Sequence, residues 1–216
     1  MILPSITFKK DYRVFKEEQT ITFKNPITVI TGDNGTGKSS LLGAIRNLFP
    51  RIKWTMSQDS SSKGVLKESE MTDVKASYLC LSKDLYANAS EFDYDNMDVF
   101  LATMQLSSGQ GAFTQLVDML KNCADADLLI FDEPERGLSI AHQTVVCEII
   151  RQFSELHPNT QIIITTHSPR VMELCEEVHS MNHKKYVEPT EYLDFISKTE
   201  APLIKAQMIM ETLLNG

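Results

Sequence analysis

A glycine-rich segment near the start of the chain has the residues needed to hold phosphate. Residues 32–39 read GDNGTGKS and fit the pattern G-x-x-x-x-G-K-[ST]. In such a loop the backbone N–H groups turn toward phosphate oxygens, the lysine meets the β- and γ-phosphates, and the hydroxyl ligates Mg²⁺. Lys38 is also expected to act in catalysis, and Ser39 to bind the metal. The expected nucleotide-binding residues are Asn34, Gly35, Thr36, Gly37, Lys38, Ser39 and Ser40.

Two adjacent carboxylates form a second chemical group. Asp132 and Glu133 directly follow the apolar run at residues 128–131. Open α/β sheets bind their ligands at the carboxyl ends of such strands. We therefore expect Asp132 to hold Mg²⁺ and Glu133 to polarise an attacking water as general base. The alternative is a solvated acidic turn.

A histidine closes a third apolar run. His167 follows residues 162–166, IIITT, and lies 35 positions after Asp132. A histidine at a strand end is often structural, but one beside a phosphate loop is placed to contact a γ-phosphate and orient water. We expect the second role.

The segments between these motifs predict the elements that position them. Apolar periodicity predicts strands at 5–9, 20–23, 27–31, 74–81, 128–131 and 162–165, and helices from 38 to Pro50, at 110–120 and at 140–153. A weak hairpin after residue 178 and helices at 191–197 and 203–214 complete the pattern. The serine-rich residues 57–64 predict an exposed loop.

This order of elements predicts an α/β fold. Short apolar strands that alternate with helices indicate a mostly parallel core sheet flanked by helices, to which we add a small N-terminal antiparallel sheet and a short helical lobe. We expect one domain over residues 1–216. Its core would span 1–83 and 107–182, with a helical or loop insertion at 84–106 and a helical tail at 183–216.

Composition narrows the class of protein. The 216 residues carry a net charge of −8 and are 42% hydrophobic, which excludes a disordered or fibrous chain. Apolar runs fall far short of the roughly 20 residues that a membrane helix needs, and the first residues lack a signal peptide, so we expect a cytoplasmic protein without membrane insertion. The four cysteines form no CxxC pair and predict free thiols. The acidic balance argues against a broadly basic, nucleic-acid-binding surface.

Taken together, the motifs resemble those of ATP-binding cassette (ABC-type) P-loop ATPases, in particular SMC/RecF-like heads and small AAA_21-type ATPases. Residues 106–110, LSSGQ, are similar to the cassette signature LSGGQ, with Ser108 in place of the first glycine. Residues 135–139, ERGLS, resemble a D-loop, and residues 166–169, THSP, resemble a switch-histidine segment. Residues 6–23 are similar to the N-terminal sheet of SMC/RecF-type heads.

The resemblance implies an ATPase that works in pairs. Two heads would bind two ATP-Mg²⁺ head to tail, and the signature of one would close over the ATP of the other. That signature comprises Ser107, Ser108, Gly109 and Gln110, and the D-loop comprises Gly137, Leu138 and Ser139. An ATP-dependent homodimer would then act as a switch for a DNA-processing partner, a protein effector or a nuclease. The alternatives are an ATP-binding subunit of a membrane transporter and a P-loop transferase.

Several assignments stay open at this stage. No glutamine stands at positions 82 or 83 to supply a Q-loop, and Gln58 lies in the serine-rich segment. Tyr12 or Phe15 would stack on adenine, or belong to the core. DNA would bind through a local basic patch, or the same charges would simply be solvated; the residues are Lys9, Lys10, Arg13, Lys16, Arg46, Arg51 and Lys53.

Overall fold

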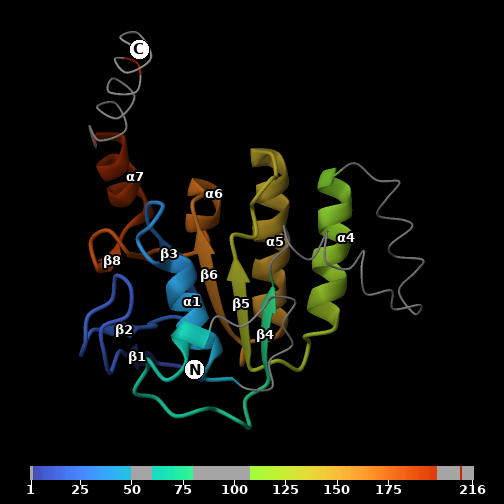
Figure 1. Cartoon of the computed structure of the whole chain (residues 1–216). Coiled ribbons are helices and arrows are strands. Elements are labelled where there is room, and N and C mark those ends of the chain that lie inside the picture. The colour runs from blue at the N-terminus through green and yellow to red at the C-terminus, as the bar shows by residue number, and fades with distance from the viewer. Residues whose placement is uncertain (1, 50–59, 80–107, 199–209, 211–216) are drawn as a thin grey trace.

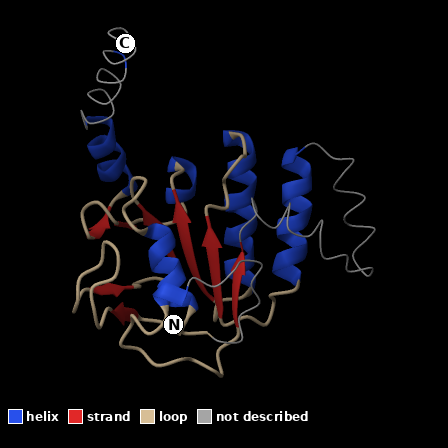
Figure 2. Ribbon diagram, in the orientation of Figure 1, coloured by secondary structure: helices blue, strands red, loops and turns tan. Residues whose placement is uncertain are grey.

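A six-stranded sheet forms the centre of the molecule (Figures 1 and 2). The computed structural model describes residues 2–49, 60–79, 108–198 and 210. The strand order is β4-β5-β6-β3-β7-β8, and every neighbouring pair is parallel except β7 and β8. The strands are β3 (Ile27–Thr31), β4 (Ala76–Leu79), β5 (Leu128–Asp132), β6 (Gln161–Thr166), β7 (Val178–Ser180) and β8 (Lys185–Val187). A separate antiparallel pair consists of β1 (Ser5–Thr7) and β2 (Thr20–Thr22).

Apolar residues on both faces explain why the central strands are buried. Successive side chains of a strand point to opposite faces. In β5, Leu128 and Ile130 therefore join one core cluster, whereas Leu129 and Phe131 join the other. A continuous apolar run thus becomes a strand covered on both sides.

Different helices cover the two faces. Helix α1 (Lys38–Arg46), the β1–β2 pair and the 3₁₀ turn η1 (Ser60–Ser62) lie on the first face, where Leu41 and Ile45 are fully buried. The second face carries α4 (Ser108–Lys121), α5 (Ile140–Leu156), α6 (Pro169–Met172) and α7 (Pro189–Lys198). Leu116 of α4 and Val146 of α5 pack there against the sheet. The fold predicted from the sequence is confirmed.

Two local predictions need correction. Helix α1 ends at Arg46 and not at Pro50, because the N–H groups of residues 47–49 bond to carbonyls three residues back, the tighter pattern common at helix ends. Leu48 and Phe49 are nevertheless core residues. The serine-rich segment is not wholly exposed, since Ser62 is buried and its hydroxyl accepts a hydrogen bond from the Asn47 amide.

Other sequence expectations fall outside the described residues. These are the insertion at 84–106, the Q-loop candidates at 58, 82 and 83, Arg51 and Lys53, and the final helix apart from Met210, which is helical. Among the residues described, no helix combines the length and apolar character needed to cross a membrane.

A buried histidine makes the stability of the fold depend on pH. His179 on β7 is 6% exposed, and burial lowers its pKa from 6.5 to about 4. The unfolded chain then binds the extra proton first, so this contribution to stability is complete above pH 6.5 and is lost as the pH falls toward 4. We expect a loss of about 3 kcal/mol from His179 between pH 7 and 4.

Urea unfolding of the wild type and His179→Gln at several pH values measures this contribution. The variant should lose that part of the pH slope, while His157→Gln, which changes a half-buried histidine at the end of α5, should retain it. Equal slopes for His179→Gln and the wild type would contradict the prediction.

Candidate functional site

The glycine-rich loop connects β3 to α1 at the carboxyl edge of the sheet. Gly37 has φ 101° and accommodates no side chain, because an added Cβ would lie 2.4 Å from Val14 Cγ2. The loop also folds on itself, with Thr36 Oγ1 donating to the Asp33 carbonyl at 2.8 Å. Asn34, Gly35 and Ser39 are exposed. The loop therefore presents an open backbone surface bounded by tightly packed glycines.

Lys38 turns back beneath this loop. Its Nζ donates to the carbonyls of Gly32 at 2.8 Å and Asp33 at 3.2 Å, and the residue is 5% exposed. Burial lowers the pKa of the Lys38 ammonium, while carboxylates nearby, Glu133 foremost, act in the opposite direction. The Lys38 ammonium is thus held at the loop, with carboxylates nearby that favour its charged form.

Asp132 ends β5 with both carboxylate oxygens engaged. Oδ1 accepts from the Thr165 hydroxyl of β6 at 2.9 Å, and Oδ2 accepts from the Tyr78 hydroxyl of β4 at 2.5 Å. Both donors come from neighbouring strands, which fix the direction of the carboxylate. Tyr78 is a contributor that the sequence analysis missed, because only the pairing of β4 with β5 brings it near.

Groups that donate hydrogen bonds to a metal-binding side chain usually orient it and tune its affinity for the metal. We expect Tyr78→Phe to raise the Mg²⁺ concentration for half-maximal ATP hydrolysis about tenfold, since Asp132 loses the donor that orients it. Tyr186→Phe removes another hydroxyl, one that donates to the Thr22 carbonyl away from this site, and serves as control. An unchanged Mg²⁺ titration for Tyr78→Phe would contradict this role.

Glu133 and His167 meet across the ends of β5 and β6. His167 Nε2 lies 3.4 Å from Glu133 Oε1, and the Arg136 guanidinium lies 3.8 Å from Glu133 Oε2. The Glu133 side chain is 24% exposed, so its carboxylate remains open to small molecules. Glu133 also has φ 50°, a left-handed conformation that is uncommon for a residue other than glycine. Such strain is often found at functional positions.

The D-loop segment follows directly. Gly137 has φ 79° and turns the chain, the Leu138 carbonyl accepts from the Gln143 amide at 2.9 Å, and Ser139 caps the first turn of α5. Glu135, at the start of this turn, is buried and bonds to the segment that carries His167. From the sequence pattern, Glu135 is only the first residue of the D-loop segment, without a role of its own.

The candidate signature lies away from the glycine-rich loop of the same chain. Ser107 falls outside the described residues, and Ser108, Gly109 and Gln110 are the first residues of α4. Helix α4 packs on the face of the sheet opposite α1, next to α5. In Figure 1, α1 lies near β3, whereas α4 lies at the right of the view, beyond α5 and β4.

Tyr12 is a core residue, which is the second of the two roles that the sequence left open, the first being to stack on adenine. It is 7% exposed, and its ring stacks with Phe8 at a centroid separation of 6.4 Å. The neighbouring Arg13 reaches the first turn of α1, since its Nη1 donates to Ser40 Oγ at 3.1 Å. Arg13 had been grouped only with the candidate basic patch. Within that patch Lys16 pairs with Asp11 at 2.7 Å.

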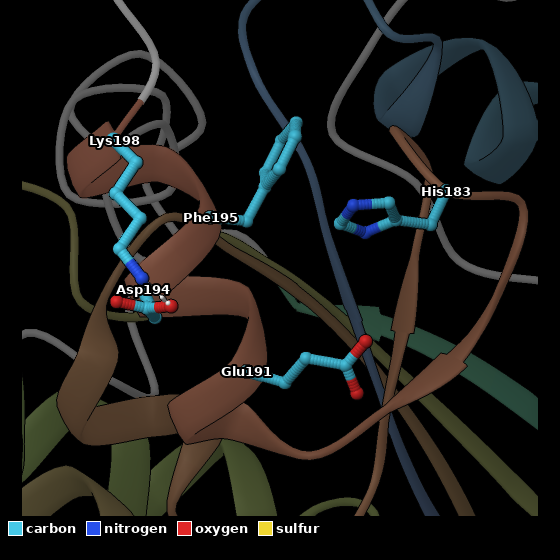
Figure 3. Close-up of a pocket in the computed structure, with 5 residues that line it drawn as sticks. All are labelled: His183, Glu191, Asp194, Phe195 and Lys198. Atoms are coloured by element: carbon cyan, nitrogen blue, oxygen red, sulfur yellow. Dashed lines mark hydrogen bonds and ion pairs between the residues drawn. The ribbon is translucent and has the colours of Figure 1, made fainter.

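A separate open pocket of about 500 Å³ lies next to the glycine-rich loop, because Asn182, which precedes the pocket residue His183, hydrogen-bonds to Asp33. Figure 3 shows His183 and Phe195 facing each other, with centroids 4.3 Å apart, and Lys198 beside Asp194. None of the candidate catalytic residues lines this pocket. Its lining residues are His183, Glu191, Asp194, Phe195 and Lys198.

Comparison with known families supports the interpretation of the motifs. The AAA_21 family model, described as "AAA domain, putative AbiEii toxin, Type IV TA system", matches residues 57–173, more than half of the chain. A second model, described as "AAA domain", matches residues 10–77.

Individual relatives are distant. Structural maintenance of chromosomes protein 3 of Arabidopsis thaliana is 29% identical over 105 residues, which are 45% of this chain and 9% of that protein. The molybdate import ATP-binding protein MolC of Haemophilus influenzae is 23% identical over 180 residues, covering 76% of this chain and 70% of that protein. The SMC head domain from Thermotoga maritima superimposes with a TM-score of 0.55 at 16% identity, covering 82% of this chain and 93% of that one, and shows the same fold.

Proposed function

Because this chain belongs to the AAA_21 family and is an ABC/SMC-like P-loop ATPase, we propose that it hydrolyses ATP as one half of a head-to-tail dimer. One observation carries the proposal. A buried lysine in a phosphate-type loop, a carboxylate pair and a histidine meet at a single edge of the sheet, with His167 Nε2 3.4 Å from Glu133 Oε1. This set supplies phosphate binding, metal binding and a general base together.

The residues fit ATP and Mg²⁺. The loop backbone is uncovered at Gly35, where an added Cβ would have nothing within 4 Å. Among the described residues the Lys38 ammonium bonds only to carbonyls of its own loop, so it can turn to an anion. Ser39 and Asp132 offer the hard oxygen ligands that Mg²⁺ prefers. When bound, Mg²⁺ neutralises charge on the phosphates.

The side chains then have distinct tasks. Lys38 offsets negative charge on the β- and γ-phosphates, and Arg13, at Ser40, adds a second cation beside the loop. Glu133 accepts a proton from the attacking water, while His167 contacts the γ-phosphate and holds that water in line. Their mutual contact keeps base and orienting group together.

A second copy of the chain completes the site in this proposal. Helix α4, which begins with the signature, and helix α1, which follows the loop, pack on opposite faces of one sheet, so we expect a second copy to bring a signature to the loop. Head-to-tail pairing would set Ser107 to Gln110 of one copy against the nucleotide of the other. The helix start would supply N–H donors to phosphate charge.

We infer that the dimer acts as a switch for a partner, because hydrolysis would release the contacts that ATP bridges. The partner class we propose is a protein effector or nuclease, with DNA reached through a local basic patch or through that partner. The likeness to MolC supports a second candidate, the ATP-binding subunit of a transporter. Identifying what co-purifies with ATP-loaded Glu133→Gln separates the two.

The direct test is phosphate release by the full chain with ATP and Mg²⁺ over a range of protein concentrations. Specific activity should rise with concentration, since active sites form only on pairing. Duplex and single-stranded DNA are added in parallel at low salt, where phosphate contacts are strongest. An absence of hydrolysis at all concentrations would contradict the ATPase, and constant specific activity would contradict the dimer.

A further inference from the structure

Glu135 holds the segment that carries the switch histidine. Its Oε1 accepts the Thr166 hydroxyl at 2.6 Å, the His167 N–H at 2.9 Å and the Ser168 N–H at 3.2 Å. Thr166 Oγ1 in turn accepts the Ser168 N–H at 2.9 Å. One carboxylate oxygen thus holds the backbone N–H groups of His167 and Ser168 and the side chain of Thr166.

This carboxylate is held where a charge is costly. Glu135 is 7% exposed, and its Oε2 finds no hydrogen-bond partner within the described part of the chain. A group used only to fill space would be less costly if apolar, because a buried carboxylate must give up water. All the hydrogen bonds that this carboxylate accepts come from residues 166–168, so the carboxylate fixes the position of that segment.

The same segment is tied to the D-loop by a second residue. Ser168 Oγ donates to Gln143 Oε1 at 2.6 Å, and Gln143 Nε2 donates to the Leu138 carbonyl at 2.9 Å. Glu135 itself begins the turn that contains Leu138, whose N–H donates to the Glu135 carbonyl. The D-loop and the His167 segment are therefore connected at two points.

We propose that Glu135 is a positioning residue for hydrolysis, which holds the His167 backbone so that the imidazole stays beside Glu133. This role rests on the proposed ATPase function. Through Gln143 it also makes the position of His167 depend on the D-loop, so that docking of the second copy at the D-loop sets the histidine for turnover.

The decisive experiment is a double-mutant cycle in the ATPase assay. Glu135→Ala should lower kcat about 10- to 100-fold, the size expected for misplacing a reacting group, with KM for ATP within about twofold of wild type. In a His167→Ala background the same change should cost less than about twofold, because the group that it positions is gone. Glu173→Ala, directly after α6, changes an exposed carboxylate that pairs with Arg170; it is the matched control and should leave kcat unchanged.

A second readout does not depend on turnover. The amides of His167 and Ser168 should exchange with solvent faster in Glu135→Ala than in wild type, and Glu135→Gln, which keeps an acceptor oxygen, should restore both their protection and most of kcat. If Glu135→Ala fails to fold, the cycle is run with Thr166→Val, which removes one of the three donors.

The outcomes separate the two claims. Losses that multiply in the double variant, or a Glu135→Ala chain with wild-type kcat, would overturn the positioning role while leaving the ATPase intact. A folded wild-type chain without ATP turnover would overturn the proposed function and this role with it.

Discussion

Replacing Glu133 with glutamine is expected to lower ATP turnover by about two to three orders of magnitude while ATP still binds. Glutamine matches glutamate in size and accepts the same backbone conformation, so φ 50° and the contact to the His167 ring can persist. What is lost is the capacity to take a proton from water. With hydrolysis blocked, ATP should hold two copies together.

Steady-state phosphate release and size determination by light scattering, with and without ATP and Mg²⁺, check this prediction. Glu148→Gln provides the same chemical change on the exposed face of α5, where Glu148 pairs with Arg151 at 2.7 Å. That control should retain turnover. Wild-type turnover in Glu133→Gln would show that another group acts as base, and a monomer at saturating ATP would contradict the trapped dimer.

Replacing Lys38 with methionine is expected to weaken ATP binding on the order of 100-fold, which is about 2.7 kcal/mol. The ammonium is the one cation donating to carbonyls of the loop itself among the described residues, and methionine keeps length but no charge. We expect the stability of the folded chain to decrease much less than the affinity for ATP. Burial lowers the Lys38 pKa, so the charged form is less favoured in the folded chain than in the unfolded chain, and methionine removes that cost.

Thermal unfolding with increasing ATP separates these effects. ATP should raise the Tm of wild type in proportion to the logarithm of its concentration above Kd, and should leave the Tm of Lys38→Met nearly unchanged. Lys75→Met, which removes an exposed lysine paired with Asp125, should respond like wild type. An ATP response in Lys38→Met equal to wild type would contradict the role of the lysine.

The sequence was sufficient to predict the residues that lie at strand and helix ends. Asp132 and His167 directly follow buried apolar runs, and Lys38 follows such a run after the glycine-rich loop; a parallel sheet brings the ends of these runs to one edge. The core strands were predictable for the same reason, since their apolar residues fill both faces of the sheet.

Contacts between distant segments were not predictable from local pattern. Tyr78 reaches Asp132 only because β4 pairs with β5, and the two residues are 54 positions apart. Tyr12 lies in the core because its turn folds onto Phe8 and Phe15, which places Arg13 at the first turn of α1. Glu135 looked like one more charge of a turn, since its donors come from the segment 31 to 33 positions later.

The central claim is that each active site uses residues from two copies of the chain. Mixing two inactive variants tests it most directly. Lys38→Met disables the phosphate loop, and Ser107→Arg disables the signature. In a mixed head-to-tail dimer, one site would combine the intact loop of the Ser107→Arg copy with the intact signature of the Lys38→Met copy. We predict that the mixture regains ATP turnover that neither variant shows alone. A mixture as inactive as its components, at concentrations where wild type is active, would contradict the shared site.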